Sequence, residues 1–211
     1  MPKFTKRALL LLLAGVMLSA SLYGCTGGTN NSATPTASAQ TGELSKGNSV
    51  TVGIAQDLDS LDPHKAVAAG TSEVLFNIFE GLMKASPDGG VIPAVASDYT
   101  VSDAGLQYPF TLREGVKFPH GHAVTMEDVL YSLERCAGSE NDGTPLISAF
   151  SNVTSMEATD DTHVVLTLKE PNLEFINSMT AAIIPANSSD TIATTPVGTG
   201  PFAFTSYTPQ Q

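Results

Sequence analysis

Three aspartates in one short stretch are the first residues whose type and spacing suggest chemistry. Asp57, Asp59 and Asp62 lie close together just before Pro63, and carboxylates grouped in this way can bind Ca²⁺. A calcium loop of the EF-hand type also needs a glycine and a closing glutamate at fixed later positions, and neither follows here. We therefore interpret the three side chains as turn carboxylates, which bond to nearby backbone groups.

Two further groups could take part in chemistry. His120 and His122 lie two residues apart in a turn, where a metal ion would need more ligands than the neighbouring sequence offers. The run Gly198-Thr199-Gly200 could suggest phosphate binding, but it leads directly into a proline. The sequence contains no nucleophile elbow, phosphate loop, dinucleotide fingerprint or zinc helix. It therefore predicts no catalytic residue, no metal and no cofactor.

The N-terminal segment predicts export and a lipid anchor. Basic residues precede an apolar run at 8–20, which is shorter than the ~20 residues that span a bilayer and suits a secretory signal. The run ends in Leu22-Tyr23-Gly24-Cys25, which resembles the bacterial lipobox. We expect a signal peptide at 1–24 and lipidation of Cys25, on the extracellular or periplasmic face of the cell membrane. The alternative is a plain signal peptide followed by a chance cysteine.

A flexible tether is expected at 25–48, because this segment is rich in small polar residues and lacks hydrophobic periodicity. Its typical reach is roughly 25 Å. If Cys25 carries lipid, Cys136 has no disulfide partner, and its place on the apolar side of a helix predicts a buried structural thiol. The formal net charge of −11 argues against a nucleic-acid partner.

The stretch 106–136 predicts the elements that hold the fold together. Apolar residues alternate at 106–112, as in a half-buried strand, and a short loop predicts a hairpin that returns at 116–118. Thr125 and Asp128 have the spacing of a capping box and begin an amphipathic helix. Pro109 lies within the strand and predicts an edge position or a local bulge.

The remaining pattern predicts a mixed α/β (α+β) fold. We expect strands at 50–54, 153–158 and 162–168, and a last strand through Tyr207. A helix N-capped by Thr71 is expected to run to about Lys84, with a stripe of core residues on one side. A short helix is expected within 172–182.

Taken together, seven stretches resemble one family, in the family's order and at its spacing. The chain resembles the extracellular solute-binding proteins of ABC transporters, in the dipeptide, oligopeptide and nickel-binding family, over about 50–207. The matching stretches are SLDPHK at 60–65, FEGL at 79–82, PAVA at 93–96, LREGVKF at 112–118, TMEDV at 125–129 continuing through SLER at 132–135, KEPN at 169–172 and PVGTGPF at 196–202.

The resemblance implies a particular domain organisation. It implies a periplasmic-binding-protein-like type II lobe with an inserted satellite subdomain, incomplete in this chain. The first segment of lobe I would be 49–84, the satellite 85–194, and 195–211 the return to lobe I. Family members are more than twice this length and have a second lobe. The resemblance therefore implies an N-terminal piece, either a truncated gene product or an incomplete sequence.

The resemblance also implies a function without chemistry. In the family, two lobes close over a ligand by hinge motion, and the membrane permease recognises the closed form. The loop residues Val67, Ala68 and Ala69 would lie at the wall of the cleft, where backbone groups could pair with an extended peptide as in strand addition. A plain loop before a helix is the other interpretation.

The implied partners are a peptide or other small solute, the ABC permease subunits, and the membrane through the lipid anchor. Two alternatives stay open: a fragment without transport function, and a secreted lipoprotein enzyme.

Overall fold

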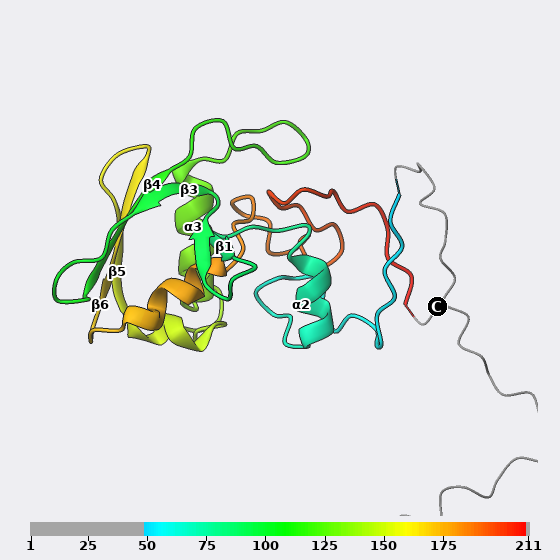
Figure 1. Cartoon of the computed structure of the whole chain (residues 1–211), viewed down its shortest axis with the longest axis horizontal. Coiled ribbons are helices and arrows are strands. Elements are labelled where there is room, and N and C mark those ends of the chain that lie inside the picture. Colours follow the sequence, from blue (N-terminus) through cyan, green and yellow to red (C-terminus); the bar gives the residue numbers. More distant parts are fainter. Residues whose placement is uncertain (1–48, 210–211) are drawn as a thin grey trace, which may run out of the picture. The chain divides into compact units, whose positions relative to one another are not determined.

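The protein is represented by a computed structural model that describes residues 49–209. The expected signal peptide at 1–24, the tether at 25–48 and Cys25 lie outside the described residues. The described helices and strands all belong to one compact unit, Thr51–Gln211 (Figure 1). Among the helices of residues 49–209, none combines the length and the apolar character that crossing a bilayer requires.

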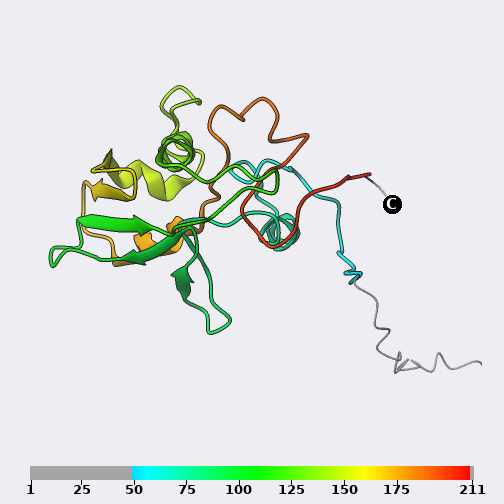
Figure 2. The same ribbon diagram turned by 90° about the horizontal axis from the view of Figure 1, so that it is seen from above.

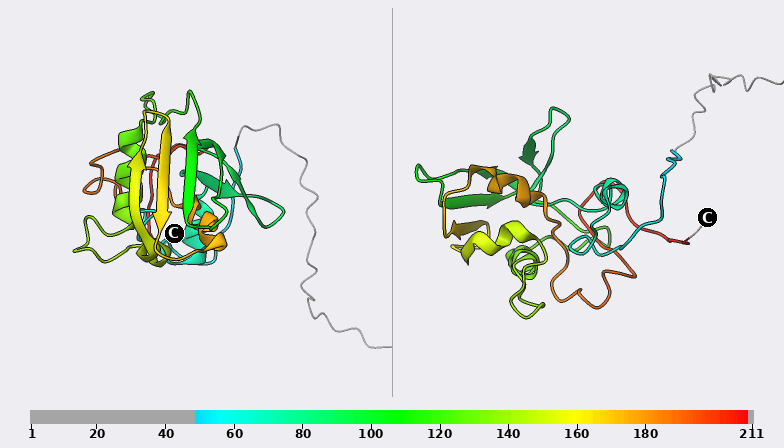
Figure 3. Two further views of the ribbon diagram at one scale, coloured as in Figure 1. Left: turned by 90° about the vertical axis from the view of Figure 1, so that its left-hand side faces the viewer. Right: turned by 90° about the horizontal axis from the view of Figure 1, so that it is seen from below.

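An antiparallel four-stranded sheet is the centre of the fold, and it is seen face-on in Figure 3. Residues 108, 110 and 112 of one strand are buried on one side of it, as the alternating pattern predicts, because successive strand residues point to opposite faces. The strands follow the order β3 (Ala96–Tyr99), β4 (Gln107–Leu112), β6 (His163–Leu168), β5 (Val153–Ala158).

Helix α3 (Met126–Cys136) covers this sheet and begins as predicted. Thr125 Oγ1 accepts from the Asp128 N–H, and the Asp128 carboxylate accepts from the Thr125 N–H, which completes the capping box. Its buried residues Val129, Leu133 and Cys136 join one core with the sheet and with two short 3₁₀ helices. These are η1 (Ser148–Asn152) and η2 (Leu173–Thr180), the latter in the place of the expected short helix.

The predicted hairpin between 106–112 and 116–118 is wrong. Strand β4 already pairs with β3 on one side and β6 on the other, so the chain leaves the sheet after Leu112. Residues 116–124 instead fold back on themselves around a turn at 119–122, with Val124 N–H donating to the Val116 carbonyl.

The expectation that Pro109 marks an edge strand is also wrong, because β4 is interior. The alternative, a local bulge, is not found at Pro109 itself: the ladder of β3 with β4 shifts register between Ala96 and Asp98, opposite Leu112 and Thr111. The Pro109 carbonyl accepts from the Thr100 N–H, just past the end of β3. The N–H and the carbonyl of a strand residue point to the same side. The N–H that Pro109 lacks would therefore also point towards Thr100, beyond the end of β3, so no hydrogen bond within the β3–β4 ladder is lost.

Helix α2 (Ala69–Leu75) is shorter than predicted and begins elsewhere. Its N-cap is Ala68, and Thr71 lies buried in the first turn, where its Oγ1 accepts from the Asp59 N–H. The Asn77 amide donates to the carbonyls of Glu73 and Val74, which satisfies groups at the helix end. The chain then enters β1 (Met83–Ala85), which pairs with β2 (Val91–Pro93) as a separate two-stranded sheet that projects from the unit (Figure 2).

A second, smaller core lies beside α2. Its buried residues come from two parts of the chain that are distant in sequence: Leu75, Ile78, Phe79, Ala182, Ile184 and Ile192. The expected strands at 50–54 and through Tyr207 are wrong, since neither segment pairs with a strand among residues 49–209. Strands are held by ladder hydrogen bonds, and an apolar alternating pattern alone does not supply a partner.

Backbone packing explains the Gly198-Thr199-Gly200 run. The Gly200 N–H donates to the Ile78 carbonyl, and a Cβ at Gly198 would overlap that same carbonyl oxygen. Glycine lets two backbones approach this closely, because it has no Cβ. The run therefore joins the C-terminal segment to the chain after α2, and this packing accounts for its glycines.

Candidate functional site

The loop that carries Val67, Ala68 and Ala69 is held in place by Asp59. The Asp59 Oδ2 atom accepts from Val67 N–H at 2.8 Å and from Ala68 N–H at 3.0 Å. The hydrogen bond from the Thr71 side chain, followed by the one from Val67, lowers the pKa of Asp59 to about 2. The carboxylate is therefore ionised at physiological pH and fixes the loop, while the Val67 side chain remains 89% exposed.

A buried charged cluster, which we call the Arg135 cluster (Asp62, His64 and Arg135), includes two residues that come just before this loop in the chain, and the Asp62 carbonyl accepts from the Ala66 N–H. Arg135 donates from Nη1 to Asp62 Oδ1 at 3.1 Å and from Nη2 to Asp62 Oδ2 at 2.6 Å. It also donates from Nη1 to His64 Nδ1 at 2.8 Å. Each of the three residues is at most 4% exposed. A bidentate arginine–carboxylate pair of this kind gives geometric definition as well as attraction.

The cluster fixes the protonation state of His64. Arginine can only donate, so His64 Nδ1 must accept, and the proton resides on Nε2, which donates to the Ala182 carbonyl at 2.8 Å. Burial lowers the pKa of His64 below its ordinary value, which keeps the imidazole neutral. Burial alone would raise the pKa of Asp62, but the hydrogen bonds and charge of Arg135 outweigh it and hold that pKa below its ordinary range.

Three segments of the chain therefore meet at the Arg135 cluster. Asp62 and His64 belong to the loop before α2, Arg135 belongs to α3, and Ala182 follows η2. One turn earlier on α3, Ser132 Oγ accepts from the Ile184 N–H and donates to the Ile184 and Asp128 carbonyls. The loop and the segment after η2 are thus fixed to the same helix.

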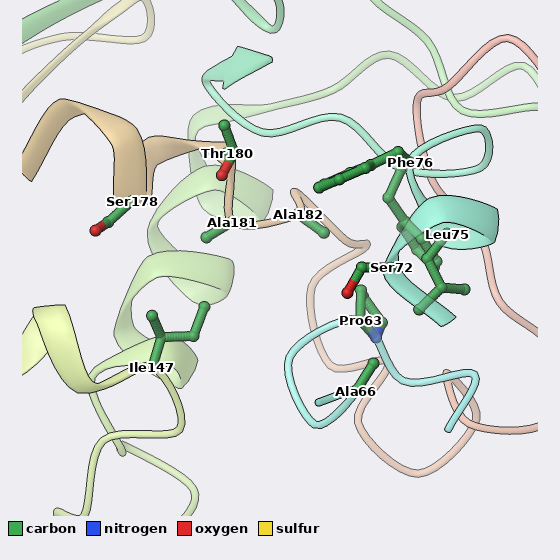
Figure 4. Close-up of a pocket in the computed structure, with 11 residues that line it drawn as sticks. Pro63, Ala66, Ser72, Leu75, Phe76, Ile147, Ser178, Thr180, Ala181 and Ala182 are labelled. Carbon is green, nitrogen blue, oxygen red and sulfur yellow. The ribbon is translucent and has the colours of Figure 1, made fainter. Parts of the chain in front are cut away.

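A half-open cavity of about 180 Å³ lies between these two fixed segments (Figure 4). One wall comes from the loop and α2, through Ala66, Ser72 and Phe76. The opposite wall comes from the segment after η2 and from Ile147. Ala66 directly precedes Val67, and Ser72 Oγ donates to the Ala68 carbonyl, so two residues that line the cavity adjoin the candidate loop.

Other candidate residues do not gather into a site. His120 and His122 are exposed, with their ring centroids 4.7 Å apart, and within residues 49–209 no three His, Cys, Asp or Glu side chains are placed to hold a metal ion. Cys136 is fully buried, and burial raises the pKa of its thiol to about 12. The thiol is therefore an unreactive part of the core.

The geometry described so far is a mixed α/β fold in which α3 covers the sheet and Asp59 holds the loop before α2. The family model for bacterial extracellular solute-binding proteins, family 5 Middle, matches residues 90–211, which is more than half of the chain. The chain belongs to this family.

Individual relatives agree with this assignment. The glutathione-binding protein GsiB of Salmonella typhi is 34% identical over 160 residues, which make up 72% of this chain and 31% of that relative. This chain therefore spans less than a third of the length of that curated relative. The relatives found in this way are named as binding proteins rather than enzymes.

Solved structures share the fold. The PBP AgaA from A. tumefacien R10, solved with agropinic acid, has a TM-score of 0.66 and 30% identity, covering 72% of this chain and 32% of its own. The periplasmic binding protein DppA from Helicobacter pylori, solved with the peptide STSA, has a TM-score of 0.64 and 26% identity, covering 73% and 36%.

The sequence reasoning missed the Arg135 cluster, although a signal was present. Asp128, Ser132 and Arg135 follow one another at helical spacing, one position behind the apolar residues Val129, Leu133 and Cys136. Residues four and three apart share one face of a helix. On this helix the polar stripe beside the apolar one is buried and bonds to the segments before α2 and after η2, whereas such a stripe on most amphipathic helices faces solvent.

Proposed function

We propose that this chain is part of the extracellular substrate-binding component of an ABC importer, with peptides as its substrate class, and that it forms one wall of the binding site. The observation that carries the proposal is the loop at Val67–Ala69, which Asp59 fixes through two backbone amides and which follows a segment anchored by the Arg135 cluster. A wall that is already ordered loses little conformational entropy when a ligand binds.

Peptide recognition at this loop would use backbone groups. Two of its three amides, those of Val67 and Ala68, already donate to Asp59, and the Ala68 carbonyl accepts from Ser72. Pairing with an extended peptide would therefore fall to the Val67 carbonyl and the Ala69 N–H, in the manner of strand addition. Two relatives support this substrate class: one is named a glutathione-binding protein, and the other was solved with the peptide STSA.

The domain organisation belongs to the same proposal. We assign 49–84 to lobe I, 85–194 to the satellite and 195–211 to the return to lobe I, with hinge closure against a second lobe as the binding motion. The hydrogen bonds from Gly200 and Phe202 to the carbonyls of Ile78 and Asn77 support the return of the C-terminal segment to the first.

Amide NMR of the chain with tri-alanine tests the binding proposal. We expect saturable shifts at Val67 and Ala69, and an affinity about tenfold weaker in Asp59→Ala, because the freed loop must be ordered on binding. Asp103→Ala, an exposed aspartate in another loop, is the matched control and should bind like the unmodified chain. Saturation without shifts at the loop would contradict the proposal.

The anchor is proposed to be a lipid on Cys25, with 25–48 as the tether that separates the domain from the membrane. Cys25→Ala should release the protein into the medium of the expressing bacterium, whereas the unmodified chain stays with the membrane fraction. Membrane association that persists in Cys25→Ala would rule out the lipid anchor.

A further inference from the structure

The cavity beside the loop has a mainly apolar interior. Its floor and sides include Leu75, Phe79, Ile147 and the methyl groups of Ala181 and Ala182. Three hydroxyl-bearing residues also line it. Ser72 Oγ already donates to the Ala68 carbonyl and Thr180 Oγ1 to the Asn177 carbonyl, and the Ser178 hydroxyl points away from the other labelled side chains in Figure 4. The cavity therefore has few donors to offer, and a charged group placed there would lose its hydration without compensation.

The size of the cavity limits what can occupy it. Sites that enclose a whole drug-sized ligand measure about 300–1,000 Å³. An apolar cavity of about 150 Å³ is known to hold one benzene molecule. At about 180 Å³, the cavity has room for one aromatic ring or one branched alkyl group, not for a whole ligand.

The position of the cavity indicates where that group comes from. Ala66 lines the cavity and directly precedes Val67, and Ser72 lines it one turn into the helix that the loop begins. Figure 4 shows Phe76 reaching from α2 across the same space towards Thr180, and Phe76 itself is 55% exposed. A molecule bound at the loop would therefore have the rim of the cavity next to it.

We propose that this cavity receives one apolar side chain of the ligand, of the size of a phenyl or isobutyl group. The inference rests on the proposed function, since it takes the ligand backbone to lie at Val67 and Ala69. Successive side chains of an extended peptide point to opposite sides, so one side chain enters the cavity and its neighbours point away from it. The site thus selects for an apolar residue at one position of the peptide.

Both walls of the cavity are fixed before the ligand arrives. The His64 Nε2–H bond to the Ala182 carbonyl joins the loop wall to the opposite wall, and Ser132 holds the next residues through Ile184. Fixed walls cannot move together to close the cavity. An apolar side chain that enters it therefore gains van der Waals contacts while the protein loses little conformational entropy.

The first probe is toluene, and methyl NMR of the full chain measures its binding. We expect saturable shifts at the methyl groups of Leu75 and Ile147, and none at Leu133 in the sheet core. Ser72→Leu places a side chain into the cavity and should weaken toluene binding at least tenfold. Glu73→Leu adds the same side chain one position along, where the native residue is exposed, and should leave toluene binding unchanged. Equal toluene affinities in the two variants would overturn the inference.

Two peptides separate this inference from the proposed function. Ala-Phe-Ala should bind about tenfold or more tightly than tri-alanine, because a buried phenyl group adds transfer free energy of that order. Ser72→Leu should abolish the preference, and Glu73→Leu should keep it. Equal affinities for the two peptides in the unmodified chain overturn the inference and leave the proposed function intact. If neither peptide binds while toluene does, the proposed function fails and the inference fails with it.

Discussion

The sheet region (β3–β6 with α3) and the α2 region (residues 51–82 with 182–207) are built from similar apolar residues but bury them to different degrees. In the sheet region, Tyr108, Phe110, Val164 and Leu166 are at most 1% exposed. In the α2 region, Leu75 and Phe79 are buried, yet Val52 is 75% exposed and Phe202 is 62% exposed. The difference shows that an alternating apolar pattern leads to burial only where a neighbouring strand pairs with it.

The Arg135 cluster joins the two regions, and breaking it should have the largest effect. Arg135→Met leaves the Asp62 carboxylate buried without its partner and should lower the free energy of unfolding by about 3–5 kcal/mol. The measurement is urea denaturation followed by circular dichroism.

The control for this variant is Lys65→Met. Lys65 Nζ lies 3.8 Å from Asp62 Oδ2 but its side chain is 58% exposed, so the loss should stay below about 1 kcal/mol. The double variant Asp62→Leu with Arg135→Met removes both charges and should recover most of the stability. If the single Arg135 variant were as stable as the Lys65 variant, the cluster would not be what joins the regions.

Truncations in each region sharpen the comparison. Leu166→Ala opens a cavity in the completed sheet core and should cost about 2–5 kcal/mol. Phe202→Ala removes a larger side chain from the α2 region but should change the free energy of unfolding by only about 0.5 kcal/mol, because that side chain is mostly exposed. Thermal or urea unfolding of both variants measures the two losses in the free energy of unfolding. Similar losses in the free energy of unfolding for the two variants would mean that the α2 region is packed as well as the sheet region.

The pH dependence of the free energy of unfolding also tests the Arg135 cluster, with a smaller expected effect. Burial holds the folded pKa of His64 below the ordinary value of 6.5, so the unfolded chain takes up a proton first as the pH falls. Stability should therefore decrease as the pH drops from about 7 through the His64 range, by at most about 1.4 kcal/mol per pH unit for one proton. The lowered pKa of Asp62 adds a further loss below about pH 4.

His64→Gln should remove the slope just below pH 7 and keep the acid loss below about pH 4. His120→Gln, at an exposed histidine, should leave the slope unchanged. Urea denaturation at several pH values measures both. An unchanged slope in His64→Gln would show that another group is responsible for it.

The sequence predicted best those elements whose partners are close along the chain. The capped start of α3 and the strands expected at 153–158 and 162–168 need only local signals, and all three are observed. The length of α2 depends on the Asn77 side chain bonding back to Glu73 and Val74, which the apolar periodicity does not reveal. The apolar stripe assigned to the core runs from Val74 to Leu82: Leu75, Ile78, Phe79 and Leu82 are buried, Val74 is only partly buried, and only the beginning of the stripe is helical.

The candidate site was harder to predict, because it depends on contacts between distant residues. Asp62 and His64 meet Arg135 across more than seventy positions of sequence. The run of aspartates was correctly interpreted as turn chemistry for Asp59 and for Asp62, whose Oδ1 accepts from the His64 N–H two residues on. The buried ion pair that Asp62 also forms with Arg135 was not predicted. The assignment of Val67, Ala68 and Ala69 to ligand binding stays a prediction.

The buried thiol of Cys136 provides a way to follow the two regions separately in time. With a pKa of about 12 and no exposed surface, it can react with an alkylating reagent only when the sheet region opens. The labelling rate under native conditions therefore reports the opening of that region alone, while amide hydrogen exchange in α2 reports the other. If the α2 region exchanges many times before the thiol is labelled once, the two regions open as separate cooperative units.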